Sequence, residues 1–152
     1  MKSRFLILSF LLTLTCQSTW AKIELPNIFS DNMVLQRNEK VLLWGWANTG
    51  EKITIHTSWD NEDYAIETTI NAKWEIELDT PEAGGPYEIE FKGSENEITL
   101  ENIMIGEVWV ASGQSNMEWS ATSNKGIDNG EEEIKNANYP NIRFFTIARR
   151  TS

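Results

Sequence analysis

Cysteine and histidine are nearly absent from this chain of 152 residues, which contains one of each, Cys16 and His56. Structural zinc sites are built from several cysteine and histidine ligands, and the chain lacks the residues for such a site. A lone cysteine also forms no disulfide within the chain, so the fold depends on an apolar core. We therefore expect neither a bound metal ion nor a cofactor.

Basic residues are scarce as well. Lysine and arginine together number 13 against 23 aspartates and glutamates, which gives a formal net charge of −10. Nucleic acids and anionic membranes bind proteins through basic patches that displace counterions. The charge balance therefore argues against both classes of partner.

Long apolar runs are confined to the N-terminus. The run Phe5–Leu14 follows two basic residues and is too short to span a bilayer. Thr19-Trp20-Ala21 then supplies small residues at both positions that a cleavage site before Lys22 requires. We expect residues 1–21 to be a signal peptide, with no membrane insertion after cleavage, and the protein to be exported to the periplasm or the exterior of a bacterial cell. A lipoprotein site at Cys16 is a minor alternative, because the three residues before it fit that pattern poorly.

Residues 22–104 carry the periodicity of β-strands. Apolar and polar side chains alternate in several segments, which turn-forming glycine and proline residues separate. Such alternation is typical of strands with one face packed and the other in water. Short strands at regular spacing predict a β-sandwich domain over residues 22–104. The clearest segments are Lys52–Trp59, Trp74–Leu78 and Tyr87–Phe91.

Two kinds of side chain in these strands have both a structural and a functional interpretation. Trp44 and Trp46 share one face of the apolar run Val41–Trp46 and could stack on sugar rings. Tryptophan in a strand more often packs in a core, which is the location we expect. His56 lies on the polar face of its strand, so we expect a surface residue rather than the base of a catalytic site.

The pattern changes after residue 104. Val108–Ala111 is apolar without alternation, which is typical of a strand buried on both faces of a parallel sheet. An acidic first turn opens a helix predicted over residues 131–137, and Ile142–Ile147 reads as another strand. Strand, helix and strand form one βαβ unit, the start of an α/β domain. We expect residues 105–152 to be the incomplete opening of such a domain, because two strands cannot bury their own faces.

A serine follows the first of these predicted strands. Ligands of open α/β sheets bind at the carboxyl ends of the strands, and Ser115 lies just beyond that end. A serine hydroxyl needs an adjacent base to act as a nucleophile, and backbone N–H groups must stabilise the developing oxyanion. Gly113 allows a sharp turn, whereas Met117 stands where the elbow of α/β-hydrolases has its second glycine. No histidine follows Ser115, so the base is not visible in the sequence.

The residues around this serine resemble a known family. Glu107–Trp119, with Gly113-Gln114-Ser115-Asn116-Met117 at its centre, is similar to the first sequence block of sialate O-acetylesterases, a branch of the SGNH hydrolases. Leu25–Arg37 looks like the start of the β-domain that these enzymes carry before the catalytic domain. The resemblance implies that residues 105–152 begin a flavodoxin-like three-layer α/β hydrolase domain. It also implies that the chain is the N-terminal part of such an enzyme.

By this resemblance Ser115 is the nucleophile that attacks an acetyl ester and forms an acetyl-enzyme, which water then hydrolyses. Its backbone N–H contributes to the oxyanion hole, and Gly113, Gln114 and Asn116 shape the supporting loop. Trp119 is either a wall of the substrate pocket or a structural residue, and both interpretations stay open. The family's catalytic aspartate and histidine belong to later blocks that this chain does not contain. We therefore expect the chain alone to be inactive.

The expected partner is an acetylated carbohydrate, and the expected activity is removal of O-acetyl groups from sialic acid or related sugars. An acetylxylan-type esterase is an alternative that the first block does not distinguish. A further alternative is a non-catalytic sugar-binding remnant, because the residues that activate the serine are missing.

Overall fold

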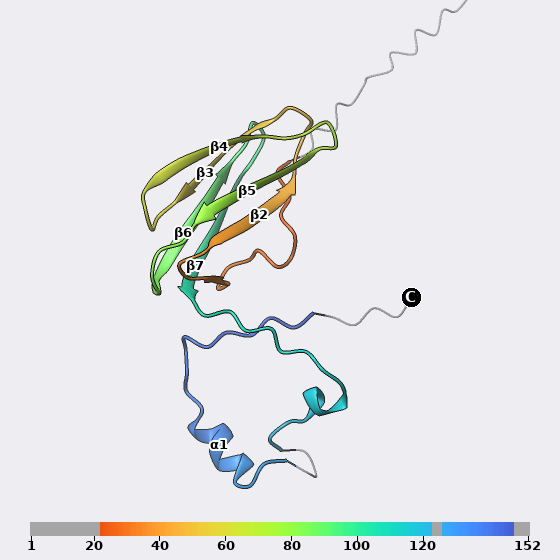
Figure 1. The fold of residues 1–152 in the computed structure, drawn as a ribbon, viewed down its shortest axis with the longest axis vertical. Coiled ribbons are helices and arrows are strands. Elements are labelled where there is room, and N and C mark those ends of the chain that lie inside the picture. Colours follow the sequence, from red (N-terminus) through yellow and green to blue (C-terminus); the bar gives the residue numbers. More distant parts are fainter. Residues whose placement is uncertain (1–21, 123–125, 148–152) are drawn as a thin grey trace, which may run out of the picture.

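The computed structural model describes residues 22–122 and 126–147, so the signal peptide expected over residues 1–21 lies outside the described residues (Figure 1). Strands dominate the first part of the chain, and two short helices follow them. In chain order the elements are β1 (Val34–Gln36), β2 (Lys40–Trp46), β3 (Lys52–Thr57), β4 (Glu62–Glu67), β5 (Lys73–Asp79), β6 (Gly84–Lys92), β7 (Glu97–Gly106), the 3₁₀-helix Ser115–Glu118 and α1 (Gly130–Asn136).

The strands form two sheets. The larger has five strands in the order β1-β7-β6-β3-β4, and the smaller pairs β2 with β5. Neighbouring strands are antiparallel except β1 and β7, which run parallel with Val34 opposite Met104. One apolar core joins both sheets, since Trp74 of β5 meets Phe91 of β6 at a ring-centroid distance of 5.6 Å. The first part of the chain is thus a mainly β unit with a shared core.

The predicted alternation is confirmed in these strands. In β3, Ile53 and Ile55 are buried while Lys52 is exposed, and in β5, Trp74 and Leu78 are buried between exposed charged residues. Each fully buried aliphatic side chain stabilises the fold by roughly 1.5–3 kcal/mol. The alternation of apolar and polar residues therefore identifies the packed face of these two strands.

The core location expected for Trp44 and Trp46 is wrong. Leu43 and Gly45 are the residues of β2 that face the core, so the two tryptophans lie on the outer face. Their side chains are 36% and 38% exposed. The strand is apolar on both faces, and an apolar run does not reveal which face is packed.

The strands predicted beyond β7 are wrong as well. β7 continues to Gly106, past the predicted domain boundary at residue 104, and Val108–Ala111 then runs outside the sheets. Trp109 is 87% and Val110 91% exposed, whereas the prediction required burial. Ile142–Ile147 also forms no strand. A strand needs a hydrogen-bonding neighbour, and no strand lies beside either segment in the described part of the chain.

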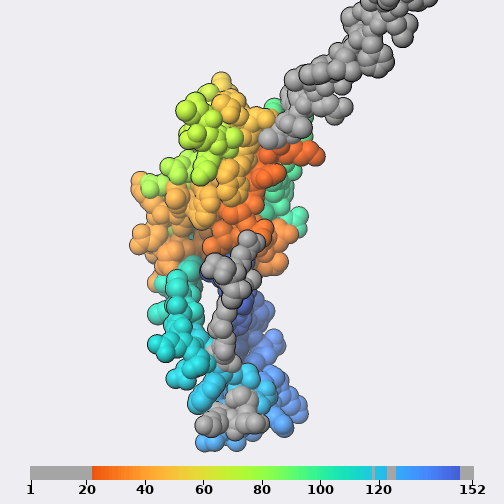
Figure 2. Space-filling model, turned by 90° about the vertical axis from the view of Figure 1, so that its right-hand side faces the viewer, coloured from red at the N-terminus to blue at the C-terminus, as the bar shows by residue number. Residues whose placement is uncertain are grey.

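The predicted helix is confirmed as α1, with Glu131–Glu133 in its first turn. Gly130 is buried because it faces the backbone of Ala121, where a Cβ atom would collide with the carbonyl oxygen. The residues after β7 form a lobe at one end of the strand-rich part (Figure 2). Across residues 22–122 and 126–147, neither helix has the length and apolarity that a bilayer-spanning helix requires.

Candidate functional site

Ser115 opens the 3₁₀-helix Ser115–Glu118, in the segment that follows β7. Gln114 before it is extended, with φ −110° and ψ −150°. The Met117 backbone N–H then donates to the Gln114 carbonyl at 2.9 Å, which closes the turn. All of the predicted site residues, Gly113, Gln114, Ser115, Asn116 and Trp119, are exposed around this turn.

Gly113 is required by the packing of the turn. A Cβ atom at this position would lie 2.8 Å from Cγ of Met117, closer than side-chain atoms approach each other. The glycine therefore provides the space into which Met117 packs. This contact explains why Met117 can occupy the position of the second glycine in the hydrolase elbow: here the side chain at that position fills the space left by the first glycine.

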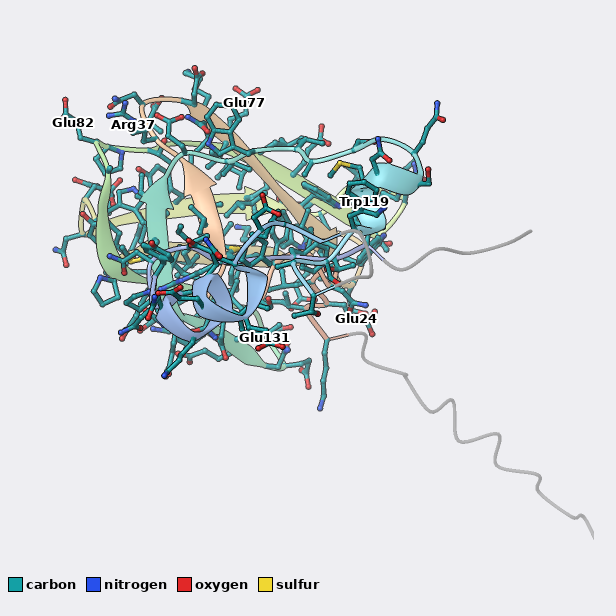
Figure 3. The ribbon with its side chains drawn as sticks, turned by 90° about the horizontal axis from the view of Figure 1, so that it is seen from below. Glu24, Arg37, Glu77, Glu82, Trp119 and Glu131 are labelled. Atoms are coloured by element: carbon teal, nitrogen blue, oxygen red, sulfur yellow. The ribbon has the colours of Figure 1, made fainter. Side chains whose placement is uncertain are left out.

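Trp119 lies directly after the turn, beside the short helix (Figure 3). Its backbone N–H donates to the carbonyl of Asn116 at 3.3 Å, which fixes the chain direction but not the position of the indole. Met117 and Trp119 both present exposed apolar surface near Ser115. Their placement is compatible with a pocket wall and with packing against further structure, so both interpretations of Trp119 remain predictions.

The segment that carries Ser115 is attached to the larger sheet where it begins. The Glu107 carboxylate accepts hydrogen bonds from Arg37 Nε at 2.6 Å and from Gln36 Nε2 at 3.0 Å. Gln36 also accepts a bond from the Val108 backbone N–H at 2.9 Å. Hydrogen bonds from Gln36 and Arg37 hold the pKa of Glu107 below its usual value, and the Glu107 carboxylate raises the pKa of Arg37. Glu82, on the same side as Arg37 in Figure 3, adds to this rise.

The same segment is attached again after α1. The Arg143 guanidinium donates to the carbonyl and the side-chain oxygen of Asn102, the latter at 3.0 Å, and to the Met33 carbonyl at 3.4 Å. Asn102 in turn donates to the side-chain oxygen of Asn32 at 2.6 Å. Both attachments are made to β1, β7 and the residues directly flanking them. Sequence reasoning missed Arg37, Glu107 and Arg143 as anchors, because partners 70 and 41 residues apart leave no local signal.

His56 lies elsewhere, on β3 of the larger sheet. Its Nδ1 is 2.8 Å from Oδ1 of Asp63, the residue opposite it on β4, and Glu90 of β6 lies opposite on the other side. Within residues 22–122 and 126–147, the Ser115 hydroxyl forms no hydrogen bond to a histidine or carboxylate. In the same described ranges, no group of three or more histidine, cysteine or acidic residues is arranged to hold a metal ion.

No family model matches the chain. It is 28% identical over 132 residues to the sialate O-acetylesterase of Mus musculus, covering 79% of this chain and 24% of that protein. The Homo sapiens sialate O-acetylesterase is 27% identical over 129 residues, covering 78% of this chain and 24% of that protein. The chain is similar to sialate O-acetylesterases. The resemblance predicted from the residues around Ser115 is thus confirmed.

A solved structure is also similar to this chain, and it too is named as an acetylesterase. The crystal structure of a carbohydrate acetylesterase from Xanthomonas citri matches with a TM-score of 0.63 and 31% sequence identity, over 69% of this chain and 24% of that one. Both kinds of relative are named as acetylesterases that act on carbohydrates. The chain spans about a quarter of the length of the sialate O-acetylesterases and of this structure.

Proposed function

We propose that this chain is part of a carboxylic-ester hydrolase that removes acetyl groups from carbohydrates, with Ser115 as the nucleophile. The observation that carries the proposal is the tight exposed turn at Ser115, within a chain similar to carbohydrate acetylesterases. The attachments through Glu107 and Arg143 are consistent with it, because they hold both ends of the segment that carries the turn against the β-rich part.

In the proposed reaction the Ser115 oxygen attacks the acetyl carbonyl carbon and passes its proton to a base. The first N–H groups of a helix have no carbonyl partner within that helix, so the Ser115 N–H is available to stabilise the oxyanion. Collapse of the tetrahedral intermediate breaks the bond to the sugar oxygen, which leaves as an alcohol. Water then attacks the acetyl-enzyme, and acetate and the free serine are released.

The base is the missing element. From the family resemblance we infer that the activating aspartate and histidine lie outside the part that this chain shares with its relatives, which is about a quarter of their length. We accordingly propose that the strand-rich part, which ends with β7 at Gly106, is a β-sandwich and that the residues after it begin an SGNH α/β domain. The exposed apolar side chains after β7 support this arrangement, because further parts of such a domain would cover them. The chain alone is then inactive.

The names of the relatives support an acetylated carbohydrate as the substrate class. We propose an O-acetylated sialic acid or a related acetylated sugar as substrate, with acetylated xylan as the competing choice. Acetate release from each substrate by the complete protein distinguishes the two. We also propose that residues 1–21 direct export and are removed; N-terminal sequencing of the exported protein should then begin at Lys22.

The decisive experiment compares Ser115→Ala with Ser112→Ala in the complete protein. Ser112 is an exposed serine of the same segment, so its variant reports any general disturbance of the loop. Loss of the nucleophile should lower kcat by about a thousandfold or more, while Ser112→Ala retains most activity. Retained turnover in a folded Ser115→Ala variant would remove Ser115 from the mechanism.

A further inference from the structure

The outer face of the smaller sheet carries a shallow depression that is not part of the Ser115 turn. It has a volume of about 330 Å³, within the size range of small-molecule sites. It lies at the end of β2 and the beginning of β5. Its lining residues are Trp44, Gly45, Trp46, Thr69, Lys73, Trp74 and Glu75.

The strand register directs both exposed tryptophans to this face. Trp44 is paired with Glu75 and Trp46 with Lys73, so the two indoles alternate with charged groups on the same surface. Phe29 packs edge-on against Trp44, with a centroid distance of 4.6 Å and an interplanar angle of 73°. This contact restrains the Trp44 ring while leaving more than a third of the side chain exposed.

The floor of the depression is rigid. A Cβ atom on Gly45 would lie 2.7 Å from Cζ2 and 2.9 Å from Cε2 of Trp74, so only glycine allows this indole to pack beneath β2. Glu24 pairs with the backbone of Trp46 through two hydrogen bonds, at 2.8 and 3.0 Å, and so holds the end of β2 in place. A ligand on this face therefore meets preorganised aromatic surface, which lowers the entropic cost of binding.

The polar groups around the rings define the ligand chemistry. Lys73 is a donor, Glu75 an acceptor, and the Thr69 hydroxyl serves as either. Neither charged residue is in an ion pair within residues 22–122 and 126–147. Apolar rings flanked by mixed hydrogen-bonding groups match a pyranose, which has an apolar C–H face and a rim of hydroxyls. The net charge of −10 disfavours anionic ligands such as nucleic acid.

We propose that the outer face of β2 and β5, at Trp44 and Trp46, binds uncharged pyranose rings of an oligosaccharide. This site is separate from Ser115. β2 begins next to the end of β7, where the Arg37 N–H donates to the Gly106 carbonyl, and it runs away from the Ser115 segment (Figure 1). Six steps of about 3.3 Å from Lys40 place Trp46 about 20 Å along the strand. The inference does not depend on the proposed esterase activity.

The test uses the full chain labelled with 5-fluorotryptophan and assigned by single Trp→Phe variants. Xylohexaose and cellohexaose serve as neutral probes and N-acetylneuraminic acid as the anionic probe, each titrated to millimolar concentration by ¹⁹F NMR. We expect a neutral probe to shift the Trp44 and Trp46 resonances saturably. Trp109, an exposed tryptophan outside the sheets, should not shift. No saturable shift with either neutral probe, shifts at Trp109 instead, or binding of the anionic probe alone would overturn the proposal.

Substitutions locate the site. Trp46→Ala should weaken binding about tenfold or more, since stacking on an aromatic ring contributes a factor of that order. Trp109→Ala, the same substitution outside the site, should bind as the wild type does. Should Trp46→Ala fail to fold by its amide spectrum, Glu75→Ala replaces it, because Glu75 is exposed and its loss should also weaken binding severalfold. Unchanged affinity in a folded variant at Trp46 or Glu75 would place the binding surface elsewhere.

Discussion

Replacing Glu51 with alanine should destabilise the β-rich part more than any other single loss of a carboxylate there. Glu51 is only 7% exposed and lies just before β3. Its Oε1 accepts hydrogen bonds from the Ser94 N–H and hydroxyl, both at 2.9 Å, and its Oε2 accepts one from the Asn48 N–H at 3.1 Å. A Cβ atom on Gly93 would lie 2.6 Å from the same Oε1. One carboxylate thus joins the turn before β3 to the turn after β6.

The magnitude follows from the hydrogen bonds that the substitution removes. The backbone N–H groups of Ser94 and Asn48 lose a charged acceptor in part-buried positions, and a hydrogen bond to a charged group contributes about 1.5–3 kcal/mol. Both turns lie near the surface, so we expect Glu51→Ala to lower the free energy of unfolding by about 2–4 kcal/mol in total. For a unit of this size that corresponds to a fall in Tm of about 10–25 °C.

Urea unfolding followed by tryptophan fluorescence measures this loss, because Trp74 is buried in the core and reports its exposure. Glu95→Ala is the matched control: it removes the same charge at an exposed position in the turn after β6, next to Ser94, which the Glu51 carboxylate binds. The control should stay within about 0.5 kcal/mol of the wild type. Equal stability of the two variants would refute the role assigned to the Glu51 carboxylate.

The same carboxylate makes the stability depend on pH. Burial raises the pKa of Glu51, but hydrogen bonds from Ser94 and Asn48 outweigh burial, so the pKa lies below its usual value. A folded-state pKa below the unfolded one means that the stabilisation is present above the unfolded pKa of about 4.3 and is lost as pH falls through the folded pKa. The stability difference between wild type and Glu51→Ala should therefore shrink below about pH 4. A difference that stays constant down to strong acid would contradict this assignment.

Two further substitutions test the Ser115 segment. Gly113→Ala in the complete protein should displace the Met117 side chain and lower kcat/KM for acetate release severalfold, while the unfolding curve stays normal. Unchanged kinetics would show that the turn tolerates a Cβ atom. Arg37→Ala removes the ion pair with Glu107, in which both side chains are about half exposed. It should leave the midpoint of urea unfolding nearly unchanged, because an exposed ion pair adds little stability, and raise the pKa of Glu107 toward its usual value by NMR titration. A pKa that does not move would show that Arg37 does not interact with this carboxylate in solution.

The β-rich part is predictable from the sequence where one face of a strand is polar. In β3 and β5 every second residue is polar or charged, so the packed face is encoded locally. In β2 both faces are apolar, and the packed face is decided by Gly45, whose missing side chain admits Trp74 from β5. That contact joins two segments distant in sequence, which is why Trp44 and Trp46 were misplaced.

The residues after β7 show a different limit. The apolar side chains of Val108–Ala111 predict burial. Burial requires a neighbouring helix or strand, and none covers these side chains in the described part of the chain. The turn at Ser115 is predictable, because Gly113 and the short motif act locally. The hydrogen bonds that attach this segment to the sheet are not predictable. Arg37–Glu107 and Arg143–Asn102 are pairs between residues distant in the sequence.

The buried apolar residues and the proposed nucleophile Ser115 lie in different parts of the chain. In the described ranges every buried apolar side chain lies between Ile23 and Ile105, whereas Phe144 and other large apolar residues after β7 are exposed. Burial of each such side chain stabilises by roughly 1.5–3 kcal/mol, so the core of residues 22–106 supplies the stability and the Ser115 segment contributes little. The proposed sugar-binding face at Trp44 and Trp46 belongs to the stable part. It should therefore bind sugar in this chain by itself, whereas the ester hydrolysis that we propose for Ser115 depends on a base that the described residues do not supply.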